Sequence, residues 1–510
     1  MNLVILAIFI SVCDGFRILC LLPYPGKSHH MVFEPLLDEL TARGHHLTVV
    51  SFFPSKTPQP NRRDISLVGL APLNVEVVDL KDFEHTYFDI GGFFKQYAVI
   101  SSLAKSNLKL CETIINHQIF EEFVEGKGDY DVILLEHFNS DCMLGLVHNY
   151  GLPSVGLMSC AMLSWFPSRV GAATNPAVFP NQLSPVTEEM SFLEKMENAF
   201  YIHFYNTWFD YAIRVDEQRI LESRLGRKLP PLRDVGKNTS VVLVNVHHTW
   251  NGVKVMPPSV IEVGGIHLHN RSLQPLPVHL DKWMNDAEHG TILFSFGSLI
   301  RGSSLPPKRL DAILKVFARI KQRVIWKWEN EDIKGLPNNV LVVKWLPQYD
   351  LLRHHNCVAF ITHGGMLSLT ETVAAGVPAL VVPVLGDQPG NAAYAQKAGF
   401  AEVLPFDHIE EETMYRLLMR VLTPEMRARA KAVSREWWDR PLSPMDSAVY
   451  YVERTARYRG LNMSAHARWV NTLQLAVFES LGLLLIGMLV VIGVACCPCK
   501  KFNVVKVKQS

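Results

Sequence analysis

Short apolar runs alternate with helix-length amphipathic segments along the first part of the chain. Residues 17–22 form an apolar run, residues 31–43 carry apolar side chains at helical spacing, and residues 47–53 are apolar again. This order predicts a strand, a helix and a second strand. Further elements of the same series are expected at residues 132–135, 141–150 and 154–157. Strands that alternate with helices predict a parallel sheet that is covered on both faces.

A second series of the same kind follows a break in the pattern at residues 263–277, which are rich in Gly, His, Asn and Pro. Strands are expected at residues 291–296, 324–328, 340–345, 358–362, 379–383 and 401–404, and a helix at 308–320. The pattern predicts two facing, Rossmann-like, doubly wound α/β domains, with the ligand site in the cleft at the carboxyl ends of their strands. The expected bounds are 16–266 for the N-terminal domain, 267–280 for the linker and 281–460 for the C-terminal domain.

An apolar stretch lies at each end of the chain. Residues 3–12 are too few to span a bilayer, which takes about 20 apolar residues, and they predict a signal peptide over residues 1–15. Residues 474–497 carry Glu479 as their single charge and predict one transmembrane helix. The lysines of the tail, residues 498–510, follow at once, so the positive-inside rule places the tail in the cytosol and the body in the lumen, as a type I single-pass protein.

The tail also indicates a location in the cell. Lys506 and Lys508 lie at the fifth and third positions from the carboxyl terminus, as in the dilysine signals of endoplasmic reticulum membrane proteins. A tail that is basic only because it flanks a membrane span is the alternative. Acceptor sequons for glycosylation begin at Asn238, Asn270 and Asn462, on the expected lumenal side.

Composition and charge narrow the function. The 510 residues are 48% hydrophobic and 19% charged, which is typical of a globular protein. Lys plus Arg exceed Asp plus Glu by one, a balance that argues against a nucleic acid partner. The nine cysteines show neither a disulfide framework nor metal-ligand spacing. No dinucleotide-binding or P-loop glycine motif follows a predicted strand, which argues against dehydrogenases and P-loop enzymes.

One segment, residues 345–388, concentrates polar side chains at the expected strand ends. In its strand-to-helix turn, Gly364 and Gly365 allow a phosphate close to the backbone. The helix start offers free N–H groups and His363 adds a donor, so we expect a diphosphate to bind there.

The same segment offers groups for the rest of a nucleotide sugar. Glu371, a little over two turns along the helix, is placed to accept ribose hydroxyls on the side of Ser368. Trp345 is suited to stacking on a base, with core packing as the alternative. Asp387 and Gln388 begin the next helix, where a hexose would lie.

These anchors, together with Gln348, match the signature of the UDP-glycosyltransferases at its spacing, and the resemblance extends over nearly the whole chain, especially to insect members. It implies the GT-B type of fold and a UDP-sugar that is a co-substrate, with no cofactor or metal. It also implies that Trp345 and Gln348 hold uracil, Glu371 the ribose, His363 and Ser298 the diphosphate, and Asp387 and Gln388 the sugar. The chain departs from vertebrate members at Leu367, where they usually carry Asn.

An acceptor hydroxyl needs a base near the sugar, and His29 is the candidate. It follows the loop 23–28 after the first strand, where the family has its catalytic His, and the adjacent His30 is the rival. A carboxylate that fixes the tautomer of the base would assist it. Family members use Asp at the end of a neighbouring strand, and this chain has Glu136 there; Asp141 is the alternative partner.

The acceptor is expected to be a small lipophilic alcohol or phenol. Residues 198–211 are dense in aromatics, which fits a core or membrane-apposed helix, or alternatively a wall of the acceptor pocket. The resulting hypothesis is an inverting transfer of a hexose, glucose above glucuronic acid, from a UDP-sugar to that hydroxyl. A membrane protein of the same fold that binds such ligands without catalysis is the alternative, and a homo-oligomer is left open.

Overall fold

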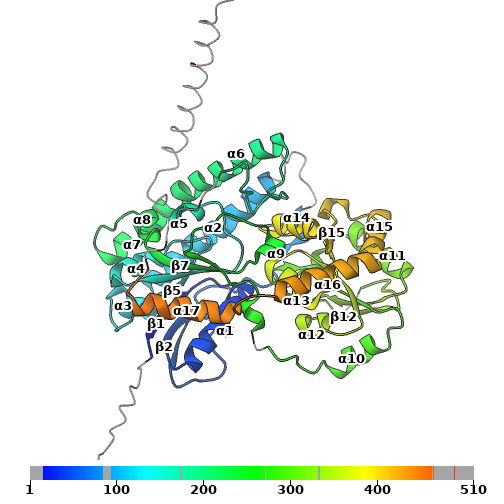
Figure 1. The fold of residues 1–510 in the computed structure, drawn as a ribbon, viewed down its shortest axis with the longest axis horizontal. Helices are drawn as coiled ribbons and strands as arrows, with labels where there is room; N and C mark the ends of the chain where they lie inside the picture. Colours follow the sequence, from blue (N-terminus) through cyan, green and yellow to red (C-terminus); the bar gives the residue numbers. More distant parts are fainter. Residues whose placement is uncertain are drawn as a thin grey trace, which may run out of the picture.

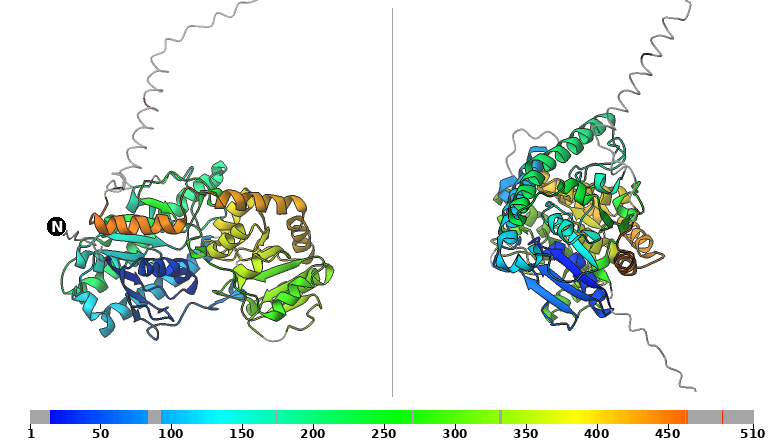
Figure 2. Two further views of the ribbon diagram at one scale, coloured as in Figure 1. Left: turned by 60° about the horizontal axis from the view of Figure 1, so that its bottom comes forward. Right: turned by 90° about the vertical axis from the view of Figure 1, so that its left-hand side faces the viewer.

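The computed structural model describes residues 15–83, 93–172, 175–269, 271–330 and 333–461, together with residues 463 and 488. Two sheets, each flanked by helices, stand side by side (Figures 1 and 2). The expected signal peptide, transmembrane helix and cytosolic tail lie outside the described residues, except for Gly15 and Met488. Among the described residues, no helix combines the length and the apolar composition that crossing a bilayer requires.

The first sheet has seven strands in the order β3-β2-β1-β5-β6-β7-β8, and all of its neighbours pair in parallel. From one edge to the other the strands are β3 (Arg62–Ser66), β2 (His46–Ser51), β1 (Arg17–Leu22), β5 (Val132–Glu136), β6 (Ser154–Met158), β7 (Thr239–Val244) and β8 (Val260–Glu262). The central strands are apolar and buried on both faces, as the sequence predicts for a covered parallel sheet.

Helices cover both faces of this sheet. The helices of this part of the chain are α1 (Lys27–Ala42), α2 (Phe93–Asn116), α3 (Glu121–Val124), α4 (Leu144–Tyr150), α5 (Pro167–Val170), α6 (Phe192–Phe209), α7 (Val215–Leu225), α8 (Leu232–Gly236) and α9 (His248–Asn251). Of these, α6 packs on α2, and α9 packs on helices of the second domain. Helix α1 packs Leu36, Leu37 and Leu40 on one face, and α2, α4, α7 and α8 cover the other. Helix α1 begins at Lys27, not near residue 31 as expected, so His29 belongs to its first turn.

The second sheet has six strands in the order β12-β11-β9-β13-β14-β15, again all parallel. In chain order they are β9 (Thr291–Ser295), β11 (Arg323–Lys327), β12 (Val340–Val343), β13 (Cys357–Thr362), β14 (Ala379–Val381) and β15 (Ala401–Val403). Its helices are α10 (Val278–Asn285), α11 (Pro307–Arg319), α12 (Gln348–Leu352), α13 (Met366–Ala375), α14 (Gln388–Ala398), α15 (Glu411–Val421) and α16 (Pro424–Trp438).

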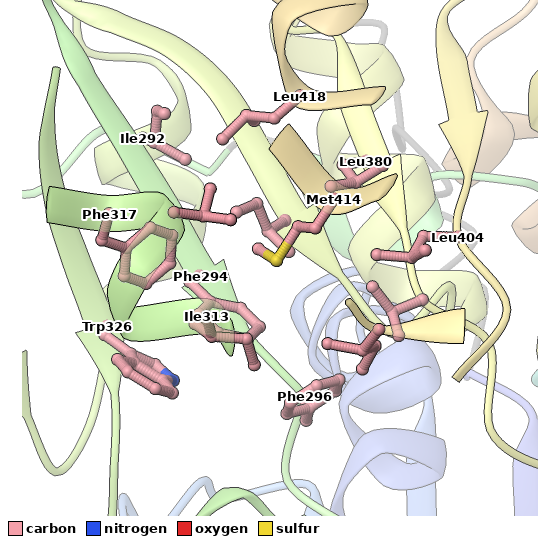
Figure 3. Close-up of a cluster of buried hydrophobic side chains, with 14 of the residues drawn as sticks. Ile292, Phe294, Phe296, Ile313, Phe317, Trp326, Leu380, Leu404, Met414 and Leu418 are labelled. Carbon is pink, nitrogen blue, oxygen red and sulfur yellow. The ribbon is translucent and has the colours of Figure 1, made fainter. Parts of the chain in front are cut away.

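Aromatic side chains fill one face of the second sheet. Phe294 of β9 stacks on Trp326 of β11 with 4.8 Å between ring centroids, and Phe317 of α11 meets Trp326 edge-on. Met414 and Leu418 of α15 close this cluster (Figure 3). The prediction of two parallel α/β domains is therefore confirmed.

Two segments cross between the domains. Strand β4 (Val78–Asp79) pairs with β10 (Ile300–Arg301), and the adjacent Leu80 and Phe83 enter the core of the second domain. In the other direction, helix α17 (Pro444–Arg457) returns from the second domain and packs Met445, Val449 and Val452 on the first sheet. Figure 1 shows α17 lying along α1. These crossings hold the two carboxyl-terminal strand edges toward each other.

One expectation from the cysteines was wrong. Cys111 of α2 and Cys142, which lies between β5 and α4, form a disulfide over a sequence separation of 31 residues. The pairing has no local signature, because the two cysteines meet only when α2 packs over the end of β5. Cys20, Cys160 and Cys357 are free and buried.

Candidate active site

A cavity of about 350 Å³ opens between the domains at the carboxyl ends of both sets of strands. The first domain supplies Tyr24, His29, Phe138 and Ser159 to its wall. The second domain supplies ten residues of the sequence hypothesis: Ser298, Trp345, Gln348, His363, Gly365, Ser368, Glu371, Asp387 and Gln388 line it directly, and Gly364 lies between two lining residues. The chain therefore gathers in one place the groups that lie far apart in the sequence.

His29 is held from several sides. Its Nδ1 lies 2.6 Å from Glu136 Oε1 and 2.7 Å from Ser159 Oγ, and Ser159 Oγ lies 3.3 Å from the same carboxylate oxygen. The rings of Tyr24 and Phe138 pack on the imidazole at 4.4 and 4.5 Å between centroids. Because Nδ1 is occupied, Nε2 is the ring nitrogen left for a ligand in the cavity.

The two rivals lie elsewhere. His30 is buried against Phe53 and is not part of the cavity wall; burial lowers its pKa to about 4. Burial opposes ionisation of Asp141, but Arg169 and Arg214 outweigh it and lower the pKa of Asp141 to about 2. The structure does not bring Asp141 to His29.

Ser159 was not found from the sequence. It follows β6 as Glu136 ends β5, so both side chains lie at the same edge of the parallel sheet. Asn245, which follows β7, donates its amide to the Ser159 carbonyl at 2.9 Å and fixes this turn. The rule that polar residues at carboxyl strand ends form sites would have selected Ser159.

The ring of His363 sits between two glycines. A Cβ on Gly297 would come within 2.6 Å of the imidazole, and one on Gly365 within 2.5 Å, so neither position accommodates a side chain. Gly297 and Gly364 also adopt φ of +78° and +85°, which favour glycine. Burial lowers the pKa of His363 to about 4, with Lys327 adding to the effect. Its buried Nδ1 has no hydrogen-bond partner among the described residues, as expected of a group that awaits a ligand.

Lys327 is a second residue that the sequence analysis missed. It ends β11 in the cavity wall, is 5% exposed, and contacts Glu76 Oε1 at 3.3 Å and Glu329 Oε1 at 3.0 Å. The two carboxylates offset the charge of Lys327, so His363 and the N–H groups at the start of α13 are the groups that this end of the cavity offers to an anion.

The nucleoside end is built around Glu371. Gln348 Nε2 donates to Glu371 Oε2 at 2.8 Å and to Ser368 Oγ at 3.3 Å, and Arg271 Nη1 lies 3.4 Å from Glu371 Oε1. Burial raises the pKa of Glu371 to about 7 against the opposing effects of Gln348 and Arg271. The buried His267 lies 3.9 Å from the same carboxylate. His267 and Arg271 come from the expected linker, so that segment contributes to the site.

Trp345 faces the cavity and is 51% exposed, so it is not a core residue. Lys27 of the first domain lies over its ring, with Nζ 4.4 Å from the centroid. Leu367 lines the cavity and packs against the apolar cluster of the first domain that contains α1. The residue that departs from the vertebrate pattern therefore makes an apolar contact between the domains.

At the sugar end, Asp387 immediately precedes α14 and accepts from Asn391 Nδ2 at 2.8 Å. Burial raises the pKa of Asp387, while Asn391 and the nearby His29 act against that rise. Gln388 uses its Oε1 to accept from the backbone N–H groups of Val384 and Leu385, which leaves its amide N–H groups for a ligand. Gln96 of α2 accepts from Gly386 N at 3.0 Å and ties the first domain to this turn.

A possible cation site lies away from the cavity. His247, His248 and Glu262 form the single group of three His, Cys, Asp or Glu residues within the described parts of the chain whose ligand atoms all lie within 4.8 Å of one another. None of the three lines the cavity.

Comparison with known proteins agrees with this geometry. The family model described as UDP-glucoronosyl and UDP-glucosyl transferase matches residues 19–509. The chain belongs to this family. It is 32% identical to UDP-glucosyltransferase 2 of Dactylopius coccus, covering 94% of this chain and 93% of that one. It is 27% identical to human UDP-glucuronosyltransferase 2B7, covering 92% and 90%.

The fold of this UDP-glycosyltransferase is also found among solved structures. The glycosyltransferase of kitacinnamycin superposes with a TM-score of 0.58 at 18% identity, covering 86% of this chain and 99% of that one. The prediction of a GT-B-like fold in two α/β domains is confirmed, and the protein is a UDP-glycosyltransferase.

Proposed function

We propose that this UDP-glycosyltransferase transfers a hexose, glucose in preference to glucuronic acid, to the hydroxyl of a small lipophilic acceptor with inversion at the anomeric carbon. The observation that carries the proposal is that His29 of the first domain and Asp387 of the second face the same cavity, close enough for His29 to influence the pKa of Asp387. A base on one domain and a sugar-binding carboxylate on the other are what a direct displacement between two bound substrates needs.

His29 acts as the general base in this proposal. The acceptor oxygen attacks the anomeric carbon while its proton passes to His29 Nε2, and the bond from that carbon to the diphosphate oxygen breaks to release UDP. Glu136 accepts from Nδ1, which fixes the tautomer and stabilises the imidazolium that forms. Ser159 supports the same contact. A single displacement from the face opposite the diphosphate inverts the configuration.

Charge develops on the leaving diphosphate, and the second domain offers groups to stabilise it. His363, Ser298 and the N–H groups at the start of α13 would bind its oxygens, and Lys327, which is paired with Glu76 and Glu329, lies in the same wall. Trp345 and Gln348 would hold the uracil and Glu371 the ribose. These groups let the reaction proceed without a metal ion in our proposal.

The acceptor end of the cavity supports a lipophilic substrate. Its wall is formed by apolar side chains of the first domain, namely Met31, Ile100, Leu103, Phe138, Leu163 and Leu183. Such a surface favours a neutral, apolar body whose single hydroxyl reaches His29.

We place the protein in the endoplasmic reticulum membrane, with its body in the lumen. The sequence supports this with the signal peptide, the apolar segment 474–497 and the lysines of the tail. The disulfide between Cys111 and Cys142 is a further support, because disulfides persist in oxidising compartments. Protease protection of the body, but not of the tail, in sealed microsomes is the expected result.

The test of the function is UDP release by purified full-length protein incubated with UDP-sugars and a panel of phenols. Acceptor-dependent UDP release supports the proposal, and replacing His29 by Ala should lower turnover by on the order of 10²-fold or more. UDP-sugar binding without acceptor-dependent release would instead support a protein that only binds these ligands.

A further inference from the structure

Helix α6 carries apolar side chains on two opposite faces. At about 100° per residue, Tyr201, Tyr205 and Phe209 lie on one face, and Phe192, Met196 and Phe200 lie about 180° away. The first face is buried against α2 and the segment that holds Leu163, Trp165 and Leu183. The second face is not: Phe192 is 74%, Met196 58% and Phe200 54% exposed. A helix on the surface of a soluble protein normally has polar residues there.

The exposed face extends beyond one row. Leu193, beside Phe192, is 74% exposed, and Val178 is 63% exposed on a loop whose Phe179 carbonyl accepts from Asn198 of α6. We call Val178, Phe192, Leu193, Met196 and Phe200 the α6 patch. A cluster of exposed large apolar side chains of this kind marks an interaction surface.

We propose that the α6 patch rests on the surface of a bilayer of zwitterionic lipid, beside the expected C-terminal anchor. The anchor limits how far the body can lie from the bilayer. Leu461 is 13 residues before the start of the expected span at residue 474, and even a fully extended chain of that length reaches only about 45 Å. The proposal therefore rests on the anchor but not on the identity of donor or acceptor.

The exit of the chain and the α6 patch belong to the same domain. Leu461 N donates to Ser240 Oγ at the start of β7, directly after α8. Figure 1 draws α6 along the upper edge of the molecule and α8 on the same upper side, while α10 lies at the lower edge. A short tether from Leu461 to a bilayer above that edge brings α6 toward the lipid.

The charged residues of α6 indicate which kind of lipid surface it fits. The turns of α6 that carry the patch contain Glu194, Lys195 and Glu197, a set with no positive excess. An interfacial helix that binds anionic lipid has basic residues on its polar face, so this helix depends on apolar insertion and fits an uncharged surface.

The position of α6 bears on how acceptors reach the cavity. The inner face of α6 packs on Ile100, Leu163 and Leu183, and these same three residues line the acceptor end of the cavity. One helix thus lies between the proposed lipid surface and the acceptor pocket. Lipophilic acceptors dissolved in the bilayer would then reach the pocket without crossing bulk water.

The test is spin labelling of the full-length protein in phosphatidylcholine nanodiscs. Cys13, Cys496, Cys497 and Cys499 are replaced by Ser, and a nitroxide is attached to Met196→Cys, Phe200→Cys or, as the control on α10, Val278→Cys. Val278 is 84% exposed and begins α10, the helix that Figure 1 draws at the lower edge of the molecule. Labels at 196 and 200 should be reached by oxygen more readily than by a water-soluble nickel chelate, and the label at 278 should show the reverse.

Two outcomes overturn the proposal. Equal access of the nickel chelate to all three labels would mean that the α6 patch faces water. Protection of labels 196 and 200 from both reagents, with dipolar broadening between copies, would mean that a second copy of the chain covers the patch. Neither measurement depends on enzymatic activity. A failure of this proposal can therefore be distinguished from a failure of the proposed function.

Discussion

His29 Nδ1 lies 2.6 Å from Glu136 Oε1, although the two residues are 107 positions apart in the chain. Helix α1 follows β1 after the short loop 23–26, and Glu136 is the last residue of the neighbouring β5, so the parallel pairing of β1 and β5 brings His29 and Glu136 together. The resemblance to the family leads to the expectation of Asp at this position, and the contact shows that the longer side chain of Glu136 reaches the imidazole.

The first prediction follows from that contact. Replacing Glu136 by Ala should lower kcat by on the order of 10²-fold, because the imidazolium loses its counter-charge and its fixed tautomer. The variant combining His29→Ala with Glu136→Ala should be scarcely worse than His29→Ala alone, since residues that act as a unit are non-additive. Kinetics of the four proteins with one phenol and UDP-glucose measure this. Independent, multiplicative losses would separate Glu136 from His29.

Ser159 should have a smaller effect. A neutral hydrogen bond contributes about 1 kcal/mol, so Ser159→Ala should lower kcat about fivefold with little change in the KM for the donor. The matched control is Ser164→Ala, a buried serine whose hydroxyl donates to Asn181 Oδ1 instead of contacting His29. An equal loss of kcat in both variants would mean that the effect is structural.

Donor binding should depend on pH through Glu371. Burial raises the pKa of this carboxyl to about 7, and ribose hydroxyls donate to its ionised form. Binding is therefore favoured by loss of the proton, and affinity rises with pH. For a pKa of about 7, the Kd for UDP-glucose should fall about tenfold between pH 6 and pH 8.

Calorimetry without acceptor measures that Kd, and UDP-glucose has no phosphate group that titrates in this range. Glu371→Gln keeps the shape of the side chain but removes the titration, so its Kd should be the same at both pH values. His363 and His267, with pKa values lowered to about 4 and about 3, remain neutral throughout. A pH dependence that survives in Glu371→Gln would assign the effect to another group.

The disulfide should contribute measurably to stability. It closes a separation of 31 residues between Cys111 and Cys142, and the chain-entropy relation gives about 3–4 kcal/mol for a loop of that size. The variant with both cysteines replaced by Ala should unfold at lower denaturant concentration by a corresponding amount. A reductant should destabilise the wild type but leave this variant unchanged. Equal sensitivity of both proteins to reductant would contradict the assignment.

Local patterns predicted most of the fold because the central strands are continuous apolar runs. Residues 17–22 and 154–157 were placed within one residue of β1 and β6. The pairing of β4 with β10 was not foreseen, because two short segments more than 200 residues apart carry no periodicity of their own. The return of α17 to the first sheet was not foreseen either, because its amphipathic pattern does not indicate which core it covers.

Site residues were predicted from the sequence where a motif fixes their spacing, as between His363 and Glu371. Residues that meet the site only through the fold were missed. Lys327 lay inside the strand expected at residues 324–328, and Arg271 lay in a segment expected to be a linker. The choice between His29 and His30 depended on the direction of a helix start, and the structure turns His29 toward the cavity. Each missed residue is defined by a neighbour that is distant in sequence.

The last prediction concerns the donor sugar. Among the described residues that line the cavity, Lys and Arg are represented by Lys327, beside His363 at the diphosphate end, and Arg271, beside Glu371 at the nucleoside end. The sugar end has Asp387, whose carboxyl is partly buried. A glucuronate carboxylate bound there would be a second negative charge without a cation beside it, which is costly, whereas the neutral hydroxyl of glucose would be a hydrogen-bond partner. With one phenol as acceptor, turnover should therefore be higher with UDP-glucose than with UDP-glucuronic acid.

The variant Asp387→Asn tests the reason for this preference. It removes the repulsion between the two carboxylates, so the ratio of turnover with UDP-glucose to turnover with UDP-glucuronic acid should become smaller, even as turnover with UDP-glucose falls. A wild-type preference for the glucuronosyl donor would overturn this assignment and leave the roles of His29 and Glu136 untouched.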